Sequence, residues 1–131
     1  MKIKNNNPRV SYSKLVDSIN NYIDIQTIKN VNASKIIDGV HNKIIEQINI
    51  SNDWKQKHIN FQTVELLEKL VPKNVTPFQI LTLIKRFLEY RSDTSYFRAI
   101  QNVYTLIEYY KNPDYTKNAS VNWKKIMNTK N

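Results

Sequence analysis

The chain has 131 residues, which suffice for one hydrophobic core but not for two domains, and its 40% content of hydrophobic residues is typical of a folded protein. The absence of cysteine excludes disulfides and thiolate metal sites, and no segment has the roughly 18 consecutive apolar residues that a membrane span needs. The formal net charge of +9 favours an anionic partner.

Hydrophobic residues in the first part of the chain repeat every three or four positions, which indicates amphipathic helices. We expect a first helix over residues 12–23 and a second over residues 33–48, because Asn32 can cap the first amides of the second. Gly39, the only glycine, lies inside the second helix, which either a close helix crossing or neutral drift would explain. The apolar faces consist of Tyr12, Leu15, Val16, Ile19, Tyr22 and Ile23 in the first helix and of Ala33, Ile36, Ile37, Val40, Ile44 and Ile48 in the second.

The segment 52–71 is expected to hold one broken helix or two short ones, the second of which Asn60 can cap. Thr76 followed by Pro77 indicates the start of the next helix, because threonine accepts from free amides and proline lacks an N–H that would have no partner there. This helix should run to about Tyr90.

The last long helix is expected to begin at Ser92 or Asp93 and to end at Lys111, because Pro113 follows closely. About five amphipathic helices with short connections and almost no glycine predict an all-α protein. The expected fold is a single compact bundle or orthogonal array of about five helices, with a basic arm at each end of the chain.

The positive charge is concentrated at the two ends of the chain. Residues 1–14 and 115–131 each carry four basic residues and no acid, whereas the residues between them carry twelve Lys and Arg against eleven acids. The expected organisation is a basic N-terminal arm (1–11), a helical domain (12–112) and a basic C-terminal arm (113–131) with room for one or two helical turns from Ser120.

Lysine-rich arms bind phosphates because they release condensed counterions, and Trp123 offers a ring on which a base can stack. Packing of Trp123 and Met127 against the bundle is an equally open alternative. We therefore expect a non-catalytic nucleic-acid-associated module, and the AT-rich codon bias suggests a mobile element, a virus or a ribonucleoprotein assembly. The expected phosphate-binding and stacking residues are Lys2, Lys4, Arg9, Lys14, Lys117, Trp123, Lys124, Lys125 and Lys130, with Arg86, Arg91 and Arg98 as a secondary patch.

Two further interpretations remain open. Residues 24–43 have the outline of a helix-turn-helix DNA reader, although Asp38 would oppose phosphate there. Alternatively, the protein is an adaptor or inhibitor that binds a host or complex protein through the last long helix. The partner-binding residues would then be the outward stripe of Arg98, Gln101 or Asn102, Thr105 and Tyr109.

Little in the sequence indicates catalysis. A single glycine excludes glycine-rich phosphate loops, and no serine has the surroundings of a nucleophile. His41 and His58 lack further ligands at metal-binding spacing, so we expect both at the boundary or the surface of the core. The expected protein is cytoplasmic and not an enzyme, with no catalytic residue, metal, cofactor or membrane partner.

Overall fold

The structure is a computed structural model that describes residues 12–48, 59–89 and 96–129. Within these ranges it is helical apart from short connections, and none of the described helices is long and apolar enough to cross a membrane. The expected all-α fold is confirmed. The helices are α1 (Tyr12–Ile28), α2 (Ala33–Ile48), α4 (Phe61–Leu70), α5 (Pro77–Glu89), α6 (Tyr96–Lys111) and α7 (Pro113–Thr129).

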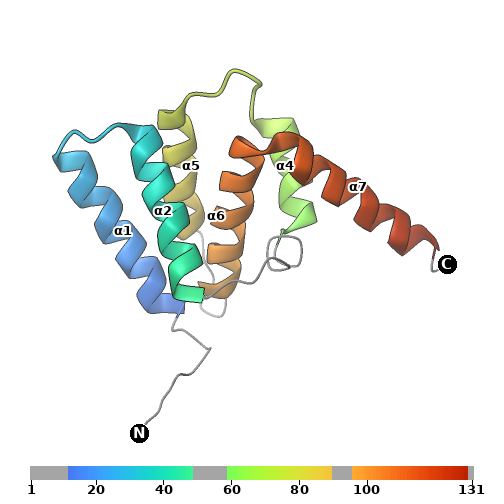
Figure 1. Ribbon diagram of the computed structural model, residues 1–131, viewed down its shortest axis with the longest axis horizontal. Helices are drawn as coiled ribbons and strands as arrows, with labels where there is room; N and C mark the ends of the chain where they lie inside the picture. Colours follow the sequence, from blue (N-terminus) through green and yellow to red (C-terminus); the bar gives the residue numbers. More distant parts are fainter. Residues whose placement is uncertain (1–11, 49–58, 90–95, 130–131) are drawn as a thin grey trace, which may run out of the picture.

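The central element is α6, which contacts every other described helix (Figure 1). Its middle is therefore buried on all sides, whereas the other helices of the bundle bury one face each. The connections α1–α2, α4–α5 and α6–α7 lie together at one end of the bundle. The buried residues of α6 are Ala99, Ile100, Val103, Tyr104, Thr105, Leu106, Ile107 and Glu108.

Three predicted helix starts are confirmed by their capping hydrogen bonds. The Asn32 side chain accepts from the Ser34 amide at 2.8 Å, and the Asn60 side chain accepts from the Thr63 amide at 3.2 Å. At α5, Thr76 Oγ1 accepts from the amide of Gln79 at 3.2 Å. Gln79 Oε1 in turn accepts from the Thr76 amide at 2.9 Å, which completes a capping box.

The first helix is five residues longer than expected. Ile25 and Ile28 are 41% and 80% exposed, so the apolar periodicity that marks the helix stops before the helix does. The true end is a Schellman motif, in which Asn30 has a positive φ of 61°. The amide of Val31 bonds to the Gln26 carbonyl, and the amide of Asn30 bonds to the Thr27 carbonyl, both at 3.0 Å.

Gly39 lies where α1 and α2 approach closely. A methyl group at this position would overlap the ring of Tyr22 on α1. Lys43 Nζ lies 5.2 Å from the centroid of the same ring, so the ring is held between the two helices. Glycine is present because the Tyr22 ring occupies the space that a Cβ would need.

Gly39→Ala is therefore expected to destabilise the protein. The overlap should cost about 1–3 kcal/mol against the ~1 kcal/mol that alanine gains as a helix former, so the expected net loss is up to about 2 kcal/mol. Urea denaturation would measure the change. In a Tyr22→Ala background the overlap is gone, so Gly39→Ala should become stabilising; an equal cost in both backgrounds would contradict this explanation.

Candidate nucleic-acid interface

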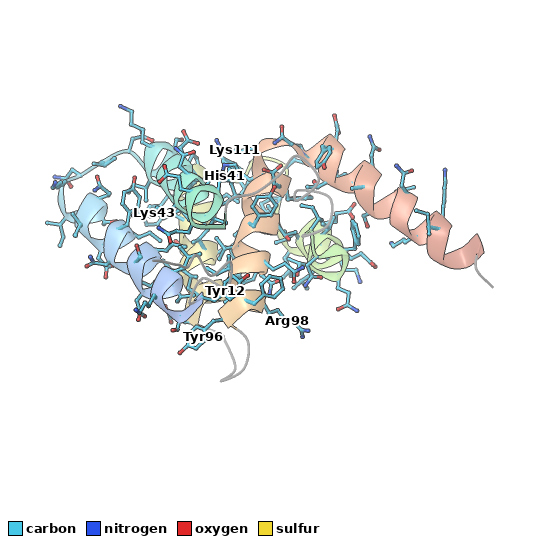
Figure 2. All side chains as sticks on the ribbon, turned by 60° about the horizontal axis from the view of Figure 1, so that its bottom comes forward. Tyr12, His41, Lys43, Tyr96, Arg98 and Lys111 are labelled. Carbon is cyan, nitrogen blue, oxygen red and sulfur yellow. The ribbon has the colours of Figure 1, made fainter. Side chains whose placement is uncertain are left out.

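The C-terminal segment forms a longer helix than the expected turn or two. Proline suits the first position of a helix, so Pro113 both ends α6 and starts α7, which runs for 17 residues. The helix rests on α6 and α4 through the buried side chains of Thr116, Ala119 and Ser120. The C-terminal end of α7 extends away from the other helices (Figures 1 and 2).

The projecting helix carries three of the expected phosphate-binding lysines. These are Lys117, Lys124 and Lys125, and the only acid of the described helix is Asp114 in its first turn. Lys124 and Lys125 are exposed, while Lys117 is half-buried, with its Nζ 6.0 Å from the centroid of the Tyr109 ring. The helix thus displays its cations on a defined surface, not on a free arm.

Lys124 is already paired with a carboxylate of the bundle. Its Nζ lies 3.4 Å from Glu65 Oε1, and both side chains are about half exposed. A pair of this kind is typically worth no more than about 1 kcal/mol because water and salt screen it. A phosphate can therefore replace Glu65 as the partner of Lys124 at small cost.

A second group of basic residues lies at the other end of α6. Lys14 is in the first turn of α1, Arg86 in the last turn of α5 and Arg98 in the first turn of α6, and all three are exposed. Figure 2 places Arg98 near Tyr12 and Tyr96 at one edge of the molecule. The exposed Glu89 shares the last turn of α5 with Arg86, whereas the first turns of α1 and α6 contain no acid.

The remaining expected residues are outside the part of the chain that the structure describes. The side chain of Trp123 lies outside the described part as well, so the structure tests neither base stacking by this ring nor its packing against the bundle. The residues outside the described ranges are Lys2, Lys4, Arg9, Arg91 and Lys130, and His58 is outside them as well.

The prediction that a stripe of side chains on the last long helix faces outward is wrong for the central residues of the stripe. Thr105 is fully buried, and Asn102 is half-buried beneath α4. Tyr109 is half-buried and packs against the core, which leaves Arg98 as the exposed member. The reason is the central position of α6: α4 covers the side that a helical wheel assigns to solvent.

Asn102 and Thr105 instead join α4 to α6 through hydrogen bonds. Asn102 Oδ1 accepts from Asn60 Nδ2 at 3.1 Å and from Thr63 Oγ1 at 2.9 Å. Thr105 Oγ1 accepts from the Asn60 amide at 3.0 Å and donates to the Gln101 carbonyl at 2.8 Å. These contacts satisfy buried polar groups of the fold and do not present them to a partner.

Sequence reasoning missed a buried polar cluster between α2, α6 and α7. Glu108 is 1% exposed, and its Oε2 lies 3.0 Å from His41 Nε2 on α2. Its Oε1 accepts from Asn112 Nδ2 at 3.3 Å. The His41 ring stacks on Tyr104, with centroids 5.8 Å apart. The sequence signal was a lone acid between the apolar residues of α6.

Two tyrosines in and beside this cluster have a pKa above the ordinary value, chiefly because they are buried. Burial is the larger cause for Tyr104, and the Glu108 carboxylate and Tyr115 add to it. Burial and then Glu108 also raise the pKa of Tyr115. Beside the cluster, Lys111 pairs with Asp38 at the surface, and Figure 2 shows Lys111 close to His41. Across the described ranges, no group of three His, Cys, Asp or Glu side chains could hold a metal ion.

Comparison with known proteins returned no similarity from which a function could be transferred. No protein-family model, no curated protein and no solved structure matches the chain. The functional argument therefore depends on the residues and their geometry.

Proposed function

We propose that this protein is a non-catalytic nucleic-acid-binding module whose main contact surface is α7. The supporting observation is the placement of Lys117, Lys124 and Lys125 on a helix that extends beyond the bundle. Segments 1–11 and 130–131, which are basic in sequence, would add phosphate contacts.

Counterion release is the mechanism by which such a surface gains affinity. Each lysine that neutralises a phosphate frees condensed cations, so the affinity falls steeply as salt is added. The exposed Asn118 and Asn122 lie between the lysines on α7 and can donate to phosphate or base oxygens. Binding of this kind requires no sequence preference.

The test is a titration of the whole protein with random-sequence duplex DNA and with RNA at several salt concentrations. On duplex DNA, replacing Lys117, Lys124 and Lys125 together by glutamine should make the slope of log affinity against log salt shallower by about 2–3 units. The matched control replaces three exposed lysines elsewhere, Lys29, Lys35 and Lys73, by glutamine. A wild-type protein with no salt-dependent binding to either polymer would refute the proposal, and equal effects of both triple variants would refute the role of α7.

The alternative of an adaptor that binds a host protein through α6 has less support. Two of its expected contact residues, Asn102 and Thr105, already accept hydrogen bonds from Asn60 at the start of α4. Substituting either should change stability, not partner binding. A protein-binding role for this chain needs a different surface.

A further inference from the structure

A hollow of about 420 Å³ opens at the end of the bundle where α1 joins α2. Its lining includes core side chains from three helices, Ile23 of α1, Ile36 of α2 and Leu81 of α5, none of which is more than 7% exposed. Val31 and Phe78 also line it. Volumes of this size with a mainly apolar lining are typical of sites that bind small molecules.

The walls of the hollow are held in place by the fold. The Schellman motif at Asn30 fixes the backbone that carries Val31, and the Asn32 cap fixes the start of α2 immediately after it. At α5, a capping box fixes the first turn, which carries Phe78. A site with fixed walls binds more tightly because less conformational entropy is lost on association.

The lining carries no unbalanced charge. Lys85 is the only ionisable residue among the described residues that line the hollow, and its Nζ lies 3.3 Å from Asp24 Oδ1. A charged ligand would give up hydration on entry and would find no unpaired counterion among these residues. The charge balance therefore favours a neutral ligand.

Uncharged polar groups line the more exposed part of the hollow. These are the side chains of Thr27, Asn30 and Thr82, and all three are exposed. Thr82 Oγ1 already donates to the Phe78 carbonyl at 3.1 Å, whereas the Asn30 amide offers both donors and an acceptor. A ligand with a hydroxyl, carbonyl or amide group would keep that group hydrogen-bonded here while its apolar part covers the core side chains.

Phe78 supplies an aromatic surface for such a ligand. Its side chain is 70% exposed although it lines the hollow, so most of the ring meets water. A ligand that lies against this ring removes apolar surface from water, which is favourable. An aromatic ligand gains additionally from the contact between the two rings.

The surroundings of the hollow favour a small molecule over a protein segment. The α1–α2 connection and the adjoining helix ends expose Ile28, but also Lys29, Asn32 and Ser34. A stable protein complex buries roughly 800 Å² on each partner, around a core that is poor in charged residues. Contact on that scale would have to cover this polar surface, whereas a small molecule stays inside the hollow.

We propose that this hollow binds a small neutral molecule that combines an aromatic ring with one hydroxyl, carbonyl or amide group. The ring lies against Phe78 and Val31, and the polar group shares a hydrogen bond with Asn30. The site has no residue in common with the proposed nucleic-acid contacts of α7, so either proposal can fail without the other.

The experiment titrates the whole protein with Nile red, a neutral dye whose emission rises in apolar surroundings. The bound dye is then displaced with three compounds that share one carbon skeleton, namely phenylpropanol, phenylpropanoate and phenylpropylammonium. The neutral alcohol should displace the dye at a concentration at least about tenfold lower than either ion, because it loses no ionic hydration. Equal displacement by all three compounds, or no saturable binding of the dye, would overturn the proposal.

Three variants test the named contacts. Thr27→Trp places a ring in the hollow from an exposed position and should weaken the dye and the alcohol at least about tenfold. Asp24→Asn leaves Lys85 without its carboxylate, so phenylpropanoate should bind several-fold more tightly while phenylpropanol is unchanged. Asn30→Gly tolerates the positive φ but removes the side-chain amide, and should weaken phenylpropanol several-fold.

The matched control is Leu66→Ser, which removes a 47% exposed apolar residue of α4, a helix that contributes no residue to the lining. Its affinity for the dye should equal that of the wild type. Dye binding that Thr27→Trp leaves intact, or that Leu66→Ser weakens to the same extent, would overturn the proposal. A dimer in sedimentation velocity that Phe78→Ser dissociates would also overturn it, because the hollow would then be a surface for self-association.

Discussion

Replacing His41 by leucine is expected to lower the free energy of unfolding by about 3–5 kcal/mol, because the buried Glu108 carboxylate loses the side chain that lies 3.0 Å from its Oε2. The His41 side chain is 14% exposed and Glu108 is 1% exposed, so water cannot replace the lost imidazole. Glu108 would keep its bond from Asn112, which at 3.3 Å is long for a hydrogen bond to a carboxylate. Urea denaturation at neutral pH would measure the loss.

A variant that lacks both His41 and Glu108 separates the effect of breaking their contact from the effect of losing each side chain. Glu108→Leu alone leaves His41 without its acceptor and should also destabilise the protein. In the His41→Leu/Glu108→Leu variant no charge is left buried, and apolar replacement of a buried pair is often neutral or stabilising. We expect the double variant to be more stable than either single one. Additive losses would show that the two side chains act independently.

An exposed pair beside the cluster provides the matched control. Lys111 on α6 and Asp38 on α2 join the same two helices but are partly exposed. Lys111→Ala should therefore cost no more than about 1 kcal/mol, although it breaks a contact between the same elements. A cost similar to that of His41→Leu would mean that burial is not the cause of the larger effect.

Local sequence signals predicted the helices because caps and prolines act within a few residues. The bonds at Asn32, Asn60 and Thr76 are all formed with residues two or three positions away. The end of α1 was missed because Asn30 replaces the glycine usual at a left-handed helix end. Glycine at that position would have marked the boundary.

The candidate site was harder to predict because it depends on contacts between distant segments. A helical wheel can separate an apolar from a polar side, but it assumes that the polar side meets water. Thr105 does not fit this assumption, because its hydroxyl is buried and accepts a hydrogen bond from the backbone amide of Asn60, 45 residues away. The His41–Glu108 pair spans 67 residues and has no local signature beyond an isolated acid among apolar neighbours.

The surroundings of the α7 lysines could not be predicted from the sequence for the same reason. The sequence located the lysines correctly, but it could not show that the segment packs on α6 and α4. Docking fixes the directions of Lys117 and Lys124 and brings Glu65 close to the latter. A helix that is already ordered loses less conformational entropy on binding than a flexible arm, which supports the proposal that α7 binds nucleic acid.

Tyr104 is expected to make the protein sensitive to alkali. Its pKa is raised above the ordinary 10.0 in the folded state, chiefly by burial and further by Glu108 and Tyr115. The unfolded chain therefore releases this proton first as the pH rises. The stabilisation is complete below pH 10 and falls above it by about 1.4 kcal/mol per pH unit.

Tyr104→Phe should remove this contribution, because phenylalanine fills the same buried space without an ionisable group. Chemical denaturation at a series of pH values would show the wild-type stability falling more steeply above pH 10 than that of the variant. Tyr96→Phe, which also removes one tyrosine but leaves Tyr104 in place, should retain the steep fall. Parallel curves for wild type and Tyr104→Phe would mean that the Tyr104 hydroxyl ionises as readily in the folded protein as in the unfolded chain, and that the core around Glu108 admits water.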